Sequence, residues 1–239
     1  VVRRDDPFTL TRRLGTFVSL LYAFLEWLGE RPPEPDVAAP MIATGGEAPP
    51  LVVVWQSESF IDMRHFGQRV ALPNLDRLRE RSSAWGRMSC VFEGGYTLRT
   101  EFAVLSGLPP AQIGPDATYP YLRAERFAEV AWPARFRRAG WTTQYIHPYD
   151  RRFFSRDKAL PRIGFETLTM LDAFDHDPAR DGRYVSDMTL TQRVLDAARA
   201  SADRPGGFLF AASMENHGPW KPGRLDGAVT PVEIYTRLL

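Results

Sequence analysis

Residues 51–59 read LVVVWQSES, and the rest of the chain is interpreted outward from this stretch. Its first six residues form a short, continuous apolar run, which is typical of a β-strand buried on both faces of a parallel sheet. Ser57 and the ionisable Glu58 follow at once. Because ligands of open α/β sheets bind beyond the carboxyl ends of the strands, the stretch predicts a central strand that delivers Glu58 to a functional rim.

Two later segments repeat this pattern. The apolar strand predicted at 142–147 leads into the sequence HPYD, and the strand predicted at 207–214 leads into ENHG. A further candidate strand lies at 87–92. Helices are predicted between and around the strands, at 72–81, 98–106, 125–139 and 187–202. Strands that alternate with helices predict an α/β fold, an α/β/α sandwich with a mainly parallel central sheet covered on both faces.

The N-terminal part has a different composition. A helix is predicted at 8–29, but its apolar run from Leu14 to Leu28 covers 15 residues and is interrupted by Glu26, whereas a membrane-spanning helix needs about 20. We expect a membrane-proximal helix in 1–30, although a helix packed on the domain is equally compatible. Residues 31–49 are rich in Pro, Ala and Gly and predict a linker. A globular domain follows at 50–239.

Composition limits the classes of partner. The net charge is +1 over 239 residues, so no global electrostatic attraction to nucleic acid is expected. Of the 30 basic residues 28 are Arg, whose planar fork suits phosphate and carboxylate oxygens, although biased codon usage explains the excess equally well. The single cysteine, Cys90, excludes an internal disulfide.

The segment EGGYTLRTEF at 93–102 places Thr97 at the start of a predicted helix. One interpretation is an N-cap, in which the hydroxyl accepts a hydrogen bond from a backbone N–H of the first turn. The other is a nucleophile, because a helix N-terminus stabilises negative charge and a bound cation lowers the pKa of a hydroxyl. Position alone favours the cap.

A series of motifs resembles one known family. The motifs are WQSESF (55–60), GYTLRTEFAVLSGLP (95–109), HPYDRRFFSRD (147–157), GFE (164–166), YVSD (184–187) and SMENHGPW (213–220). In this order they resemble the lipoteichoic acid synthase and phosphoglycerol transferase group, within the sulfatase branch of the alkaline-phosphatase superfamily. The resemblance covers roughly residues 50–225 and implies that residues 50–239 are the N-terminal part of a sulfatase-like catalytic domain.

The resemblance also implies site residues. Glu58 is expected to bind a divalent metal, and Thr97 to bind it too and to take up the phosphoryl group. Arg156 is expected to hold the substrate phosphate, with Phe154 beside the glycerol moiety where relatives often carry tryptophan. His217 is expected to contact the phosphate or to protonate the leaving oxygen.

Two of these residues have plainer interpretations. Arg156 could form a surface ion pair with Asp157, and His217 could be a hydrogen-bond donor that closes its own loop. Both interpretations stay open at the level of sequence.

The implied activity is the transfer of a phosphoglycerol-type group through a phosphothreonine, from a phosphatidylglycerol-like phospholipid to a glycan or lipid acceptor. The metal is expected to be Mn²⁺, with Mg²⁺ or Zn²⁺ as alternatives. The protein is expected at the bacterial cytoplasmic membrane, held by an N-terminal anchor, with the catalytic domain outside the cytoplasm. A phosphodiesterase or sulfatase-type hydrolase and a non-catalytic sensor or scaffold are the competing functions.

This sequence departs from the family at one point. Relatives complete the metal site with an Asp-His pair well past ENHGP, and no such pair follows His217 here. The chain therefore supplies two expected metal ligands, Glu58 and Thr97, whereas a catalytic site normally has at least three protein ligands. We expect residues 1–239 to be inactive alone and the longer parent protein to be active.

Overall fold

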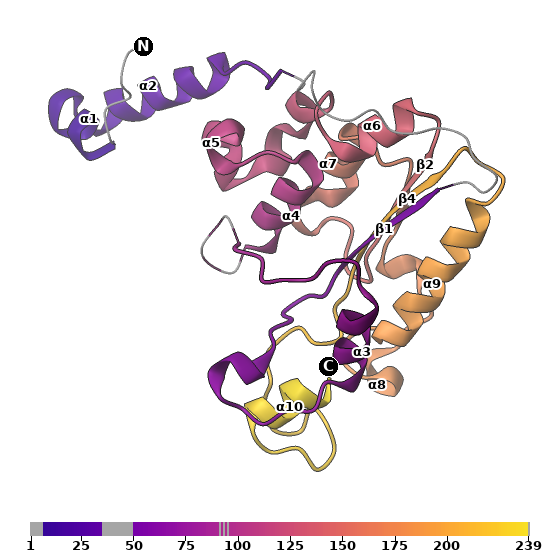
Figure 1. The fold of residues 1–239 in the computed structure, drawn as a ribbon. Coiled ribbons are helices and arrows are strands. Elements are labelled where there is room, and N and C mark those ends of the chain that lie inside the picture. The colour runs from indigo at the N-terminus through magenta and orange to yellow at the C-terminus, as the bar shows by residue number, and fades with distance from the viewer. Residues whose placement is uncertain (1–6, 35–49, 91, 93, 95, 239) are drawn as a thin grey trace.

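The fold is built on one parallel sheet. The structure is a computed structural model that describes residues 7–34, 50–90, 92, 94 and 96–238. Four strands lie in the order β1-β4-β2-β3, and all three neighbouring pairs are parallel (Figure 1). The strands are β1 (Leu51–Gln56), β2 (Thr142–Ile146), β3 (Thr167–Thr169) and β4 (Gly207–Ala212).

Helices cover both faces of the sheet. One face carries α4 (Thr97–Ser106), α6 (Trp132–Arg138), α7 (Arg156–Arg162) and the 3₁₀ segment η3 (Pro120–Phe127), which enclose the larger apolar core. The other face carries α9 (Asp187–Ala200), whose Leu190 and Val194 pack against Leu209 and Ala211 of β4. The predicted α/β/α sandwich with a parallel sheet is confirmed (Figure 1).

The remaining elements connect these layers or precede them. They are α1 (Pro7–Leu14), α2 (Thr16–Gly29), η1 (Met63–Phe66), α3 (Pro73–Arg81), α5 (Pro110–Ile113), η2 (Gly114–Thr118), η4 (Phe153–Ser155), η5 (Leu171–Ala173), α8 (Pro178–Asp181) and α10 (Pro231–Arg237).

The prediction that β1 is buried on both faces is wrong. Its residues alternate, with Val52 and Val54 packed on the core and Leu51, Val53 and Trp55 exposed. The reason is that the core cluster under α9 includes Leu209 and Ala211 of β4 but no residue of β1, so one face of β1 is left uncovered while β4 is buried along its whole length. An uninterrupted apolar run therefore did not distinguish the central strand from the edge strand.

Two other predictions need correction. The single helix expected at 125–139 is a 3₁₀ segment followed by α6, which begins only at Trp132 with Pro133 in its first turn. A proline lacks the N–H needed inside a helix but suits its first turn. No strand forms at 87–90 or at residue 92, the described part of the candidate strand.

The N-terminal segment forms two helices instead of one. Gly15, with φ of 75°, separates α1 from α2, and together they extend away from the sheet (Figure 1). No helix in the described ranges has the length and apolar character needed to cross a membrane. Of the predicted linker, residues 31–34 lack regular structure and 35–49 lie outside the described residues.

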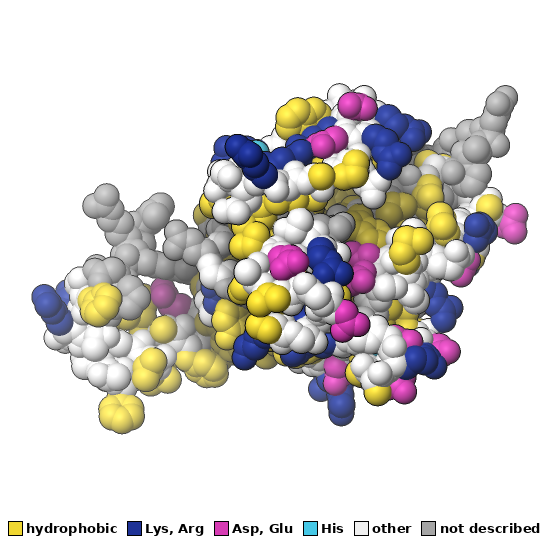
Figure 2. Space-filling view, turned by 90° about the horizontal axis from the view of Figure 1, so that it is seen from below, with side chains coloured by type: hydrophobic (Ala, Val, Ile, Leu, Met, Phe, Trp, Pro, Cys, Tyr) yellow, Lys and Arg dark blue, Asp and Glu magenta, His cyan; other side chains and the backbone are white. Residues whose placement is uncertain are grey.

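The exposed surface of α2 is nevertheless strongly apolar. Phe17 is 89% exposed, and Leu20 and Phe24 are also exposed; Figure 2 shows hydrophobic side chains on the surface of this projecting lobe. The C-terminal end of α2 is fixed to the domain, because the Trp27 indole donates to buried Asp116 over 2.7 Å and the Arg123 guanidinium lies 4.0 Å from the Trp27 ring. The helix is thus firmly joined to the domain and apolar toward solvent.

Candidate active site

Three strand ends meet at one cavity. The loops after β1, β2 and β4 enclose a space of about 90 Å³, together with the start of α4 and the segment that leads into α7. Its lining consists of Glu58, Thr97, His147, Tyr149, Phe153, Phe154, Arg156, Met214 and His217. The five residues assigned from the sequence, Glu58, Thr97, Phe154, Arg156 and His217, are thus brought together at the carboxyl edge of the sheet.

Glu58 and Thr97 are direct neighbours. The Thr97 hydroxyl donates to Glu58 Oε1 over 3.3 Å, and the backbone N–H of Glu58 donates to the Ser213 hydroxyl over 3.1 Å. Thr97 is the first residue of α4, and the capping position belongs to Tyr96, which makes no side-chain cap. The interpretation of Thr97 as an N-cap is therefore wrong, and its hydroxyl is directed to the carboxylate across the cavity.

These two side chains fit part of a metal site. A carboxylate and a hydroxyl are oxygen donors of the kind that Mg²⁺ and Mn²⁺ accept. Within the described residues no group of three or more His, Cys, Asp or Glu side chains is placed to hold a metal ion. The geometry therefore fits two ligands of a divalent cation and does not complete its coordination.

Arg156 is a buried residue, not a surface one. Its Nε and Nη2 donate to the two carboxylate oxygens of Glu101 over 3.3 and 3.0 Å, which excludes the predicted surface pair with Asp157 as its principal contact. The described residues provide no acceptor for the third guanidinium nitrogen, Nη1. Since Arg156 also lines the cavity, Nη1 is available to a bound anion.

Glu101 is the residue that sequence reasoning missed. It is fully buried and also accepts from the hydroxyls of Tyr121 and Tyr145. Burial works to raise the pKa of Glu101, but the Arg156 charge and the hydrogen bonds from Arg156 and Tyr121 outweigh burial and lower it. The missed signal was its spacing, since Glu101 stands on the buried stripe of α4 with Leu98, Phe102 and Leu105.

His147 is a second site residue without an assigned role in the sequence interpretation, although the end of β2 pointed to it. It is almost fully buried, and its Nδ1 lies 2.9 Å from the Ala212 carbonyl oxygen. Burial, with a smaller contribution from the Arg156 charge, lowers the pKa of His147 to about 4. A neutral ring that donates from Nδ1 leaves Nε2 as an acceptor.

This pKa shift predicts a pH-dependent loss of stability. Between about pH 6.5 and 4 the unfolded state binds a proton at His147 that the folded state does not, so stability falls as the pH is lowered. The free energy of unfolding lost over this pH range is about 3 kcal/mol. We expect the stability difference between the wild type and His147→Gln, measured by urea unfolding with a chelator present, to change by this amount across that window.

Asp187 makes the comparison with a variant necessary. Burial, and then the charge of Glu215, raise the pKa of Asp187 to about 6, so its contribution to stability has the opposite sign between about pH 4 and 6. The effect of Asp187 is common to both proteins and cancels in the difference. A difference that stays constant from pH 7 to pH 4 would contradict the assignment to His147.

His217 lies in a loop that an arginine side chain stabilises. The Arg224 guanidinium donates to the carbonyl oxygens of Glu215 and His217, the first over 2.5 Å. The His217 Nδ1 lies 2.9 Å from the Gly218 carbonyl oxygen, so one ring nitrogen does contact its own loop, as the plainer interpretation expected. Because the ring also lines the cavity, this contact fixes its orientation and leaves Nε2 for a ligand.

Phe154 occupies a strained backbone position. Phe154 and Ser155 are consecutive non-glycine residues with φ of 57° and 55°. Such conformations cost about 1–3 kcal/mol each and are concentrated at functional sites. The strain places the Phe154 ring 5.2 Å from the Arg156 guanidinium, as a wall of the cavity.

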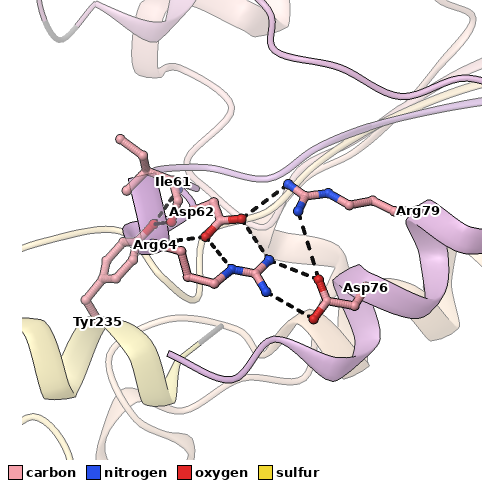
Figure 3. A network of polar contacts seen from close by, with 6 residues as sticks. All are labelled: Ile61, Asp62, Arg64, Asp76, Arg79 and Tyr235. Carbon is pink, nitrogen blue, oxygen red and sulfur yellow. Dashed lines mark hydrogen bonds and ion pairs between the residues drawn. The ribbon is translucent and has the colours of Figure 1, made fainter. Parts of the chain in front are cut away.

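A polar network holds the loop that carries Glu58. The Tyr235 hydroxyl, from α10, accepts from the Ile61 N–H (Figure 3), and it contacts the carbonyl oxygens of Ser59 and Ile61 at 2.9 and 3.0 Å. Asp62 binds the guanidinium of Arg64, and Arg64 also bridges to α3 (Figure 3). The loop after β1 is thus fixed from two sides.

Removal of the Tyr235 hydroxyl is therefore expected to loosen this loop. Tyr235→Phe leaves the Ile61 N–H without its acceptor, at a cost of about 1–3 kcal/mol. We expect faster amide hydrogen exchange at residues 59–61 and a matching loss in urea unfolding. The control is Thr236→Val on the same helix, whose hydroxyl bonds only within α10, to the Val232 carbonyl oxygen. Equal exchange at 59–61 in both variants would contradict the role of Tyr235.

Comparison with known proteins supports the motif-based interpretation. The profile of the Sulfatase family matches residues 50–232. The chain is 56% identical over 237 residues to the capsular polysaccharide biosynthesis protein RkpI of Rhizobium meliloti (strain 1021), covering 96% of this chain and 44% of RkpI. The chain thus spans less than half the length of that relative.

Solved structures share the fold. The lipoteichoic acid synthase LtaP from Listeria monocytogenes matches with a TM-score of 0.58 and 18% identity, covering 80% of this chain and 48% of LtaP. The Streptococcus pyogenes phosphoglycerol transferase GacH, solved with sn-glycerol-1-phosphate, matches with a TM-score of 0.57 and 17% identity, covering 99% of this chain and 62% of GacH. The predicted resemblance is confirmed, and the chain belongs to the Sulfatase family.

Proposed function

We propose that this chain carries the phosphoryl-transfer site of a phosphoglycerol-type transferase that modifies a glycan of the bacterial cell envelope. The observation that carries the proposal is the Thr97 hydroxyl, which lies at the N-terminus of α4, 3.3 Å from Glu58, in the cavity that Arg156 and His217 also line. A nucleophile, an anion-binding fork and a proton donor thus surround one small space.

The first half-reaction follows from these positions. The Thr97 hydroxyl loses its proton to solvent, and its oxygen then attacks the phosphorus of a phosphatidylglycerol-like donor, so that an O–P bond forms while the P–O bond to diacylglycerol breaks. Arg156 Nη1 and the N-terminus of α4 stabilise the charge on the phosphoryl oxygens. His217 gives a proton to the diacylglycerol oxygen as it leaves.

The second half-reaction reverses these roles. An acceptor hydroxyl gives its proton to His217 and attacks the phosphothreonine, which releases Thr97 and yields the new phosphodiester. A divalent metal, which we propose to be Mn²⁺, would be held by Glu58 and Thr97, with further ligands from the longer protein, and would lower the pKa of the Thr97 hydroxyl.

The membrane is the proposed location of the donor. The exposed apolar side chains of α2 and the basic Arg12 of α1 have the composition of a segment that meets lipid headgroups. The clamp of Trp27 on Asp116 and Arg123 would then hold the domain at a fixed orientation to the lipid. We propose that the catalytic domain lies outside the cytoplasm, where envelope glycans are modified. The capsular polysaccharide in the name of RkpI agrees with a glycan acceptor.

A labelling experiment tests the function. The full-length parent protein is incubated with phosphatidylglycerol labelled in its head-group glycerol and with Mn²⁺. We expect a labelled protein whose modified peptide contains Thr97, and no label after chelation. Labelled glycerol phosphate released without any acceptor product would support the hydrolase instead. Bound metal without an adduct would overturn the transferase and favour the sensor.

A further inference from the structure

Five aromatic side chains form a continuous surface at the mouth of the cavity, which we call the aromatic shelf; they are Tyr96, Tyr119, Tyr149, Phe153 and Phe154. They come from three separate segments, before α4, before η3 and after β2. Phe154 joins them, with ring centroids 4.2 Å from Phe153, 6.3 Å from Tyr96 and 6.4 Å from Tyr119. Tyr149 extends the shelf from Phe153, at 5.2 Å.

The aromatic shelf is both exposed and continuous with the site. Tyr149, Phe153 and Phe154 line the cavity itself. Tyr96 and Phe153 are 54% and 47% exposed, so their rings are accessible from solvent. Tyr96 also directly precedes Thr97 in the chain. A molecule seated on Tyr96 and Phe153 would therefore lie next to the phosphorylated threonine.

The backbone beneath the shelf supports a function in binding. The two consecutive residues with positive φ, Phe154 and Ser155, directly follow Phe153. Phe154 packs against the larger core, but core packing does not account for Phe153, whose ring remains about half exposed beside the cavity. Strain of this kind is retained where the surrounding structure needs the side chain in that place.

Three of the arginines around the shelf are already engaged. Arg99 donates to the Thr118 carbonyl oxygen over 3.1 Å and lies over the Tyr96 ring. Arg151 pairs with Asp172 at 2.7 Å, and Arg152 pairs with the neighbouring Asp150. Apart from Arg156, whose Nη1 is available to an anion in the cavity, the shelf thus presents ring faces rather than unpaired charge, which favours a neutral ligand.

The phenol hydroxyls of the aromatic shelf restrict the class of ligand further. Tyr96, Tyr119 and Tyr149 each add a phenol hydroxyl, which can both donate and accept a hydrogen bond. Flat apolar faces edged by hydroxyls match a pyranose ring, which has apolar C–H faces and hydroxyls around its rim. An acyl chain would require apolar walls without such polar edges.

We propose that the aromatic shelf binds a neutral sugar ring of the acceptor glycan, with Phe153 and Tyr96 as its stacking faces. This inference rests on the proposed function for its biological meaning, because the bound sugar would present a hydroxyl to the phosphothreonine at Thr97. The donor head group occupies the cavity on the Arg156 side, and the acceptor lies on the outer side of Phe154.

The test separates binding from chemistry. We compare the full-length protein with Phe153→Ala and with the double variant Phe153→Ala/Tyr96→Ala. The control is Phe66→Ala, because Phe66 is an exposed ring on η1 that does not line the cavity. Binding of cellopentaose is measured by calorimetry, and labelling at Thr97 by phosphatidylglycerol is measured separately. We expect the double variant to weaken cellopentaose binding about tenfold or more, whereas Phe66→Ala should leave both cellopentaose binding and labelling unchanged. Tyr96→Phe should keep most of the binding.

Each other outcome has a defined meaning. Equal cellopentaose binding by the wild type, the double variant and Phe66→Ala would overturn the proposal that the aromatic shelf binds a sugar. The proposal would also be overturned if the double variant weakened only the binding of a lipid acceptor, such as diacylglycerol in vesicles. Absence of labelling in the wild type would contradict the proposed function alone, because sugar binding is measured without any donor. If the double variant loses labelling together with cellopentaose binding, the start of α4 has been damaged. The cellopentaose binding of the single variant Phe153→Ala then decides whether the aromatic shelf binds the sugar.

Discussion

Replacement of Glu101 by alanine is expected to destabilise the protein by about 4 kcal/mol, a large part of the 5–15 kcal/mol typical of a folded domain. Glu101 has no exposed surface and binds the guanidinium of Arg156 and the hydroxyls of Tyr121 and Tyr145. Without it the buried positive charge of Arg156 loses the counter-charge that it has among the described residues, and two buried hydroxyls lose their acceptor. Unfolding in guanidinium chloride measures this loss of stability.

An exposed ion pair provides the control. Arg162 and Glu125 lie 3.1 Å apart with side chains 50% and 54% exposed, so Glu125→Ala should change stability by less than about 1 kcal/mol. Similar losses in Glu101→Ala and Glu125→Ala would show that burial of the Arg156 pair has no special importance.

Replacement of Thr97 by valine is expected to lower turnover of the full-length protein by about 10⁴-fold or more, in the range seen when an enzyme loses its nucleophile. Valine keeps the shape of threonine and removes the hydroxyl that contacts Glu58. Since Thr97 makes no cap, α4 should keep its start, and stability should change little. Turnover and thermal unfolding are measured on the same samples.

Thr100→Val is the matched control on the same helix. Thr100 lies one turn further along α4 and does not line the cavity. We expect near-normal turnover from Thr100→Val and from Thr97→Ser, which retains a hydroxyl. Substantial turnover by Thr97→Val would exclude a phosphothreonine and leave direct attack by the acceptor.

The sequence predicted three of the four described strands, β1, β2 and β4, and their shared rim, because the relevant signals are local. Each apolar strand ends in polar residues, so the meeting of Glu58 and His217 followed from the parallel direction of the strands alone. The capping interpretation of Thr97 failed because position in a helix is local, whereas the partner of the hydroxyl, Glu58, lies 39 residues away. The capping preference could not include that contact.

Other features depend on tertiary contacts that no short pattern encodes. The partner of Arg156 is Glu101, 55 residues earlier, and not the adjacent Asp157. The aromatic shelf assembles rings from segments that the sequence assigned to loops or helices. The start of α6 at Trp132 was readable in principle from Pro133, since proline suits the first turn of a helix and not its interior.

The position of β1 at the end of the strand order has a practical consequence for handling this protein. A terminal strand offers its outer row of N–H and C=O groups to any other extended chain, and the exposed Leu51, Val53 and Trp55 add an apolar face beside that row. Residues 51–56 carry no charge or proline that would discourage such pairing. Expressed as these 239 residues, the domain is expected to self-associate edge to edge as its concentration rises, and a lysine at position 53 should keep it monomeric.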